Sequence, residues 1–127
     1  MKTTELMLGD LILINNIPHK IQAIDSIYAE ILADDELYYV GEDRGHSEDK
    51  IEGILITPEI LKKNGWKHRA LFVDMEVDKN IKFGWTDMFG VSLYHNGHYM
   101  CDCKYVHTLQ HALRLCGLNK LAENFKV

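Results

Sequence analysis

The Asn96-Gly97 pair limits the fold of this chain more than any other feature. Asn-Gly is the preferred pair for a two-residue turn between antiparallel strands, because both positions of that turn need positive φ. The flanking segments 91–95 and 98–103 are rich in strand-forming residues. Together they predict a β-hairpin at this point of the chain.

Two further alternating segments precede this hairpin. In residues 71–78, apolar side chains at every second position alternate with acidic ones, and Lys79-Asn80 then turns the chain. Ile81, Phe83 and Trp85 form a second alternating set. A period of two is typical of a strand with one buried face. With the hairpin, these segments predict a four-stranded antiparallel meander.

An amphipathic helix is predicted after the hairpin, from about residue 104 to residue 116, with Gly117 at its end. Its apolar stripe consists of Tyr105, Val106, Leu109, Ala112, Leu113 and Cys116. Its opposite side consists of Lys104, His107, Gln110, His111 and Arg114. We expect the apolar stripe to cover one face of the meander.

The first half of the chain predicts short strands separated by tight turns. Apolar, β-rich runs occupy residues 11–14, 17–24, 27–33, 37–40 and 51–56. Asn15-Asn16 and Asp34-Asp35 are turn pairs between such runs. Five short strands in so few residues suit a small SH3-like β-barrel, because closure removes exposed strand edges.

A short helix is predicted between the two halves, over residues 57–65. Thr57 can cap it, Pro58 suits its first position, and Gly65 ends it. The predicted fold class is therefore α+β. We expect residues 1–127 to form a single domain and one cooperative unit, with a barrel-like lobe at 1–56 and a meander-plus-helix lobe at 66–127.

The net charge of −5 is divided unevenly along the chain. Residues 1–56 contain four Lys or Arg and twelve Asp or Glu, a balance of −8. Residues 57–127 contain ten basic and seven acidic residues, a balance of +3. Since nucleic-acid affinity comes mostly from neutralised phosphates, a nucleic-acid partner would bind the second half. Its basic surface would consist of Lys62, Lys63, Lys67, Arg69, Lys82, Lys104 and Arg114.

The sequence also indicates a cytoplasmic protein that does not bind a membrane. It contains no apolar run of about 18 residues, the length of a membrane helix. Its N-terminus has no apolar signal core. Its three cysteines are an odd number, and without a secretion signal this favours reduced thiols.

A zinc site is the most chemically specific alternative. Six residues that can bind zinc occur within seventeen positions: His95, His98, Cys101, Cys103, His107 and His111. Thr108 stands where a metalloprotease helix has its glutamate, so the catalytic base of that motif is missing. A regular hairpin would also place the hairpin histidines and Cys101 on opposite faces of the sheet. The simpler interpretation is that the histidines face solvent.

Other sites of known chemistry find little support in the sequence. A Cys101 or Cys103 nucleophile with a histidine base has no local signature. The acidic segment 41–50 does not have the spacing of a calcium loop and predicts a solvated loop. We therefore expect no catalytic residues and no cofactor.

Three blocks of the sequence, 5–10, 55–66 and 104–110, carry a resemblance to a known group. The chain resembles an uncharacterised family of small Bacteroidetes proteins, often found in prophage or mobile-element settings. The resemblance extends over most of the chain and implies an accessory or interaction protein without catalytic residues. It also implies that the position of His107 is often kept, whereas that of His111 varies.

The predicted function is a non-catalytic binding or adaptor protein, phage- or mobile-element-related, with a protein partner favoured over nucleic acid. His107 is the main candidate for a binding residue, with His111, Lys104 and Arg114 on the same side. One hypothesis gives His107 a hydrogen bond that fixes the helix. The other places it in a groove that favours an anionic partner.

Overall fold

The computed structural model describes residues 5–25, 28–39, 50–69, 72–76, 80–86 and 88–127, with only the backbone for 68, 69 and 72–76. The chain divides into two compact units, Met1–Ile54 and Leu55–Val127. Two antiparallel sheets and three helices confirm the α+β class. Within the described residues, no helix is long and apolar enough to cross a membrane. Most of the acidic segment, residues 41–49, lies outside the described residues.

The first unit contains a five-stranded antiparallel sheet with the order β4-β3-β2-β1-β5. Its strands are β1 Leu11–Ile14, β2 Ile17–Asp25, β3 Glu30–Ala33, β4 Glu36–Tyr39 and β5 Ile51–Gly53. The predicted five strands are present. No pairing joins β4 to β5 in the described part of the chain, so the sheet is open there and barrel closure stays a prediction.

β2 is long enough to pair with two neighbours in turn. Its first half pairs with β1 from Ile17 to Lys20, and its second half pairs with β3 from Ile21 to Asp25. A register shift lies between Ile21 and Ala23. Because a bulge bends a strand and increases its twist, the sheet bends at this point of β2.

The core of the first unit follows the strand period of two. In β1, Ile12 and Ile14 are buried, while Leu11 and Leu13 are half-buried. The complete buried cluster is Leu6, Ile12, Ile14, Ile21, Ile31 and Ala33. Burial of each large side chain contributes about 1.5–3 kcal/mol, so this small cluster is the main source of stability in the unit.

Three hairpin turns share one geometry. Asn15-Asn16, Asp34-Asp35 and Asn96-Gly97 have positive φ at both central residues, which defines a type I′ turn. This geometry matches the twist of the flanking strands. The predicted turn at Asn96-Gly97 is therefore confirmed, and the two turns of the first unit adopt the same form without glycine.

In the second unit, helix α1 (Pro58–Lys63) confirms the predicted joining helix. The Thr57 hydroxyl accepts a hydrogen bond from the Ile60 N–H at 3.3 Å, and Pro58 occupies the first turn. Gly65 has φ +86°, the left-handed conformation that ends a helix. Leu61 is fully buried and anchors the helix.

The second sheet has the order β10-β9-β8-β7-β6. Its strands are β6 Lys67–Arg69, β7 Phe72–Glu76, β8 Ile81–Thr86, β9 Gly90–His95 and β10 His98–Cys103. The four predicted strands are confirmed. The short edge strand β6 was not predicted, because three residues are too few to show a period.

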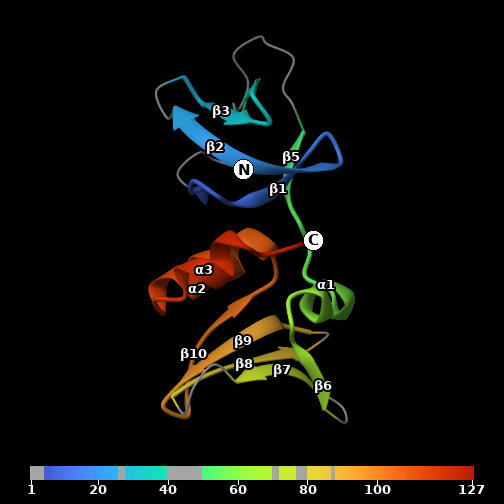
Figure 1. Ribbon diagram of the computed structural model, residues 1–127, viewed down its shortest axis with the longest axis vertical. Coiled ribbons are helices and arrows are strands. Elements are labelled where there is room, and N and C mark those ends of the chain that lie inside the picture. The colour runs from blue at the N-terminus through green and yellow to red at the C-terminus, as the bar shows by residue number, and fades with distance from the viewer. Residues whose placement is uncertain (1–4, 26–27, 40–49, 70–71, 77–79, 87) are drawn as a thin grey trace. The chain divides into compact units, whose positions relative to one another are not determined.

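Two helices follow the sheet, α2 (Val106–Leu115) and α3 (Asn119–Glu123). Figure 1 shows them on the same side of the second sheet as α1. Helix α2 begins later than predicted, because Lys104 and Tyr105 remain extended and pair with residues 55 and 56. The five-residue helix α3 was not predicted.

The core of the second unit combines the inner face of the sheet with α2. Phe83, Val91 and Leu93 are buried in the sheet, and the Phe83 ring lies 5.7 Å from that of Trp66. From α2, Val106, Leu109 and Leu113 are fully buried. The predicted burial of the apolar stripe is confirmed for these three residues.

Two residues of α2 depart from the helical-wheel prediction. Gln110 was assigned to the polar side but is fully buried, and its Nε2 donates a hydrogen bond to the Ala122 carbonyl at 3.0 Å. His107 was assigned to the same side and is only 5% exposed. For Gln110 the reason is that α3 covers this side of α2.

Candidate functional site

A bulge in β10 decides which of its residues share a face. Tyr99 pairs with Tyr94, but Cys101 pairs with Leu93, so Met100 is an extra residue in the strand. Since side chains alternate along a strand, Tyr99 and Asp102 would lie on opposite faces without the bulge. With it, both lie on the outer face, opposite to the core.

The same bulge corrects the sequence-based assignment of the cysteines. A regular hairpin would place Cys101 beside the tyrosines, but the observed register places Cys101 and Cys103 on the inner face. There Cys103 is buried, and burial raises the pKa of its thiol to about 12. A thiol with such a pKa stays protonated at neutral pH and is a poor nucleophile.

The register arranges the outer-face residues in three rows across β8, β9 and β10. The rows are Lys82, Tyr94 and Tyr99; Gly84, Ser92 and Asp102; and Thr86, Gly90 and Lys104, the last directly after β10. We call these nine residues the tyrosine face.

Asp102 organises the polar part of the tyrosine face. Its carboxylate accepts a hydrogen bond from the Ser92 hydroxyl at 2.7 Å. Hydrogen bonding to the same carboxylate raises the pKa of the Tyr99 hydroxyl. The Tyr99 and Tyr94 rings lie 6.1 Å apart at an angle of 68°. Asp102 is therefore linked to Ser92 by a hydrogen bond, and the two rings contact each other edge to face.

The middle of the tyrosine face is hollow because Gly84 has no side chain. A Cβ atom built on Gly84 would meet no atom within 4 Å. A pocket of about 190 Å³ lies here, lined by Gly84, Trp85, Thr86, Ser92 and Tyr94. An isolated glycine within a strand pattern was the one sequence signal that could have indicated this hollow.

A second pocket adjoins the first. It measures about 180 Å³ and is lined by Leu55, Ile56, Trp85, Thr86, Met88, Gly90 and Lys104. Trp85 and Thr86 line both pockets. The Trp85 indole N–H is buried and has no hydrogen-bond acceptor among the described residues.

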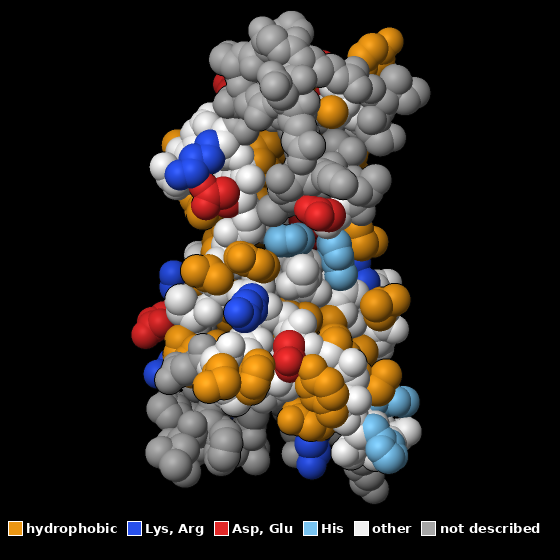
Figure 2. Space-filling model, turned by 180° about the vertical axis from the view of Figure 1, so that it is seen from behind, with side chains coloured by type: hydrophobic (Ala, Val, Ile, Leu, Met, Phe, Trp, Pro, Cys, Tyr) orange, Lys and Arg blue, Asp and Glu red, His pale blue; other side chains and the backbone are white. Residues whose placement is uncertain are grey.

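Large apolar side chains are exposed around these hollows. Tyr94 is 38% exposed and Tyr99 is 57% exposed, while Leu55 and Met88 beside the second pocket reach 61% and 72%. The space-filling view shows hydrophobic side chains gathered on the surface of the second unit, with acidic and basic side chains among them (Figure 2). Such a surface can stack planar groups, form hydrogen bonds and attract anions.

The candidate zinc ligands do not come together at one point in the described structure. His95 and His98 face each other at the exposed tip of the hairpin, and Cys103 is buried beneath the sheet. His107 and His111 contact each other on α2, with ring centroids 5.9 Å apart. No group of three or more metal-binding side chains occurs within the residues that the structure describes.

The predicted binding residues on and before helix α2 are also separated. His107 is buried and stacks on Tyr105, with ring centroids 5.9 Å apart, and it contacts His111. Arg114 is half-buried on α2. Lys104 lies outside the helix, on the tyrosine face. The four residues therefore do not share one exposed helix surface.

The residues of the predicted basic surface also lie on several separate elements. Lys62 and Lys63 lie in the last turn of α1, and Lys67 lies on the edge strand β6. Lys82 and Lys104 belong to the tyrosine face and are both exposed. The Arg69 side chain lies outside the described part of the chain.

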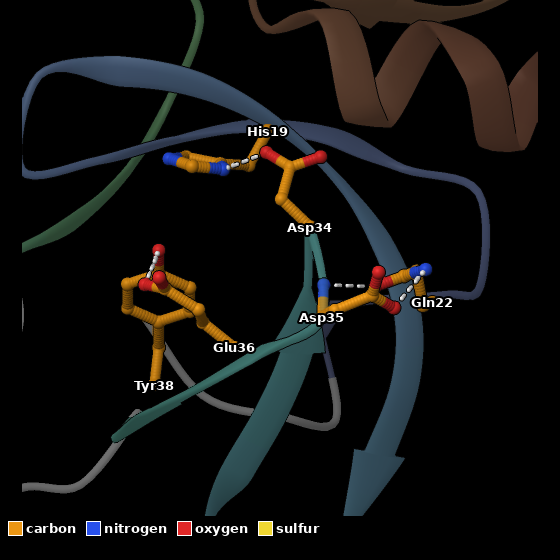
Figure 3. A network of polar contacts seen from close by, with 6 residues as sticks. All are labelled: His19, Gln22, Asp34, Asp35, Glu36 and Tyr38. Atoms are coloured by element: carbon orange, nitrogen blue, oxygen red, sulfur yellow. Dashed lines mark hydrogen bonds and ion pairs between the residues drawn. The ribbon is translucent and has the colours of Figure 1, made fainter.

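A second polar cluster lies in the first unit, around the Asp34-Asp35 turn (Figure 3). The Asp35 N–H donates a hydrogen bond to Gln22 Oε1 at 2.8 Å, and Gln22 Nε2 donates one to Asp35 Oδ1 at 3.3 Å. Asp34 pairs with His19 Nδ1. These contacts hold two non-glycine residues at positive φ, so we interpret the cluster as support for the turn.

The comparisons with known proteins contribute no further assignment. Neither the protein-family models, nor the curated proteins, nor the solved structures match this chain.

Proposed function

We propose that this protein is a non-catalytic binding module that recognises a macromolecular partner through the tyrosine face. The observation that supports this function is the exposed pair Tyr94 and Tyr99 beside the hollow at Gly84. Tyrosine is enriched in protein interfaces because it offers a large rigid ring and a polar tip. Here two such rings lie on neighbouring strands and contact each other edge to face.

The size of the hollows favours a long partner over a small molecule. Pockets for drug-sized ligands usually exceed about 300 Å³. The two hollows measure about 180 and 190 Å³ and share the lining residues Trp85 and Thr86. Each therefore suits a single ring-sized group, and a chain molecule can place successive groups in both.

The resemblance of the sequence supports the wider setting of this proposal. A phage- or mobile-element-related accessory protein in the cytoplasm would act by binding rather than by catalysis. For the first unit we propose an SH3-like barrel, supported by the strand order β4-β3-β2-β1-β5 and by the bend in β2.

A panel of immobilised peptides, oligosaccharides and oligonucleotides tests the proposed function. We expect at least one class to bind the full chain, and the double substitution Tyr94→Ala with Tyr99→Ala to abolish that binding. Tyr28→Ala is the matched control, because Tyr28 is 65% exposed in the first unit. Binding that survives the double substitution, or no binding to any class, would overturn the proposal.

The zinc alternative has a separate test. Metal analysis of tag-free protein would reveal stoichiometric zinc, and His107→Ala would remove it if this residue were a ligand. We expect metal-free protein to unfold cooperatively at the same temperature as protein incubated with zinc. Zinc that binds stoichiometrically and raises the melting temperature would replace our proposal with the alternative.

A further inference from the structure

We infer that the partner bound by the tyrosine face is a short segment of single-stranded nucleic acid. This inference rests on the proposed function, since it names the chemical class of partner for the same surface. Three features of the tyrosine face support it: the geometry of the rings, the position of the lysines and the central carboxylate.

The rings are suited to separated bases. Proteins that bind single strands commonly stack bases on aromatic side chains exposed on a sheet. The Tyr94 and Tyr99 planes meet at 68°, so two bases stacked on them would be turned away from each other. Bases of a duplex remain parallel and paired, and therefore cannot use both rings.

The lysines are suited to a phosphate backbone that crosses the strands. Lys82 lies in the first row of the tyrosine face and Lys104 in the third. Rows of a sheet are about 6.6 Å apart, so the two lysines are separated by about 13 Å along the strand direction. The second unit also carries the chain's positive charge balance, +3 over residues 57–127. Phosphates would thus be attracted at both ends of the face.

The Asp102 carboxylate would orient the bound nucleic-acid strand. Asp102 lies in the middle row and repels phosphates, whereas its oxygens can accept hydrogen bonds from base amino groups, as acidic side chains do with cytosine. The backbone would therefore follow the lysines, and the bases would point towards Asp102 and the hollows.

A peptide fits this surface less well. Extended peptides usually add to the edge of a sheet, and helical peptides require a long apolar groove. The hollow at Gly84 instead lies over the β8 and β9 strands, inside the sheet, and is lined by the polar residues Ser92 and Thr86. A protein partner is therefore the competing outcome of the test.

Fluorescence anisotropy with labelled oligonucleotides tests the inference on the full chain. We expect single-stranded DNA or RNA of mixed sequence to bind at least tenfold more tightly than a duplex of the same sequence. Tyr99→Ala should weaken single-strand binding about tenfold or more, since one stacking platform is lost. Tyr99→Phe should retain most of the affinity, and Tyr28→Ala should retain all of it. Comparing the DNA with the RNA oligonucleotides shows which kind of nucleic acid binds more tightly.

The salt dependence provides a second readout. Each phosphate contact contributes about −0.7 to the slope of log affinity against log salt for a single strand. Lys82→Ala and Lys104→Ala should each reduce the magnitude of that slope by about 0.7, whereas Lys62→Ala on α1 should leave it unchanged.

Equal affinity for the duplex, or full affinity of Tyr99→Ala, would overturn this inference. Tyrosine-dependent binding of a peptide or an oligosaccharide with no nucleic-acid binding would overturn it while the proposed function stands. No binding to any class would overturn both.

Discussion

The two units form the same kind of sheet but use their polar side chains in opposite ways. Each contains a five-stranded antiparallel sheet. In the first, His19, Gln22 and the Asp34-Asp35 turn bond to one another (Figure 3). In the second, Asp102 accepts a hydrogen bond from Ser92, which lines a hollow beside exposed tyrosines. Polar groups thus stabilise a turn in one unit and lie on an exposed sheet face in the other.

The turns show the same contrast. Asn96-Gly97 is the pair that a type I′ turn prefers and needs no side-chain support. Asp34-Asp35 adopts the same geometry with two residues that carry a Cβ, and side chains of β2 bond to both. A turn can therefore be encoded by its own residues or by those of a neighbouring strand.

Core substitutions test whether the units unfold together. Phe83→Ala in the second unit should cost about 3–5 kcal/mol, and Ile31→Ala in the first about 2–5 kcal/mol, because both side chains are fully buried. By calorimetry we expect one transition that both substitutions move to lower temperature. Two transitions, each moved by one substitution, would contradict a single cooperative unit, as would two stable proteolytic fragments separated near Thr57.

A pair of glycine substitutions tests the second sheet. A Cβ on Gly90 would lie 2.3 Å from the Cys103 carbonyl oxygen, and its φ is +77°. Gly90→Ala should therefore destabilise the protein by about 3 kcal/mol in urea unfolding. Gly84→Ala has open space and should change stability by less than about 1 kcal/mol, but it should weaken partner binding by narrowing the hollow. Similar destabilisation by both would show that the sheet is packed differently.

Replacing His107 distinguishes a structural role of this residue from a role in binding. The residue is buried and contacts the Tyr105 and His111 rings. We expect His107→Ala to lower the free energy of unfolding by about 1 kcal/mol and to leave oligonucleotide affinity unchanged. Unchanged stability with lost binding would instead favour a groove that contains His107.

Turn substitutions sharpen the contrast between the two hairpins. Asp35→Gly should stabilise the protein by up to about 1 kcal/mol, because glycine tolerates the positive φ of 61°. Gly97→Ala should destabilise it by about 1 kcal/mol, through backbone strain alone. Chemical denaturation measures both, and a loss of stability in Asp35→Gly would show that the Gln22 contact outweighs the strain.

The raised pKa of the Cys103 thiol predicts a loss of stability that occurs only in alkaline solution. Its pKa is raised from 9.0 to about 12 in the folded state, chiefly by burial. The folded protein thus retains a proton that the unfolded chain loses, so stability falls as pH rises through this range. Cys103→Ala should make the alkaline loss smaller, measured by urea unfolding at neutral and alkaline pH. Identical pH profiles would show that the thiol is accessible.

Local signals in the sequence determined much of this structure. The Thr57-Pro58 cap, the Asn96-Gly97 turn and the alternating segments each predicted an element that the structure contains. These signals are reliable because capping, turn geometry and hydrophobic period act over a few neighbouring residues.

Tertiary structure alone decided which side chains meet. The bulge at Met100 places Tyr99 and Asp102 on one face, and α3 buries Gln110. Neither follows from residues nearby in the sequence, because strand register and helix packing depend on partners elsewhere in the chain. The sequence therefore determined most elements of this protein, while the pairing of β9 with β10 decided its candidate site and the docking of α3 decided the burial of Gln110.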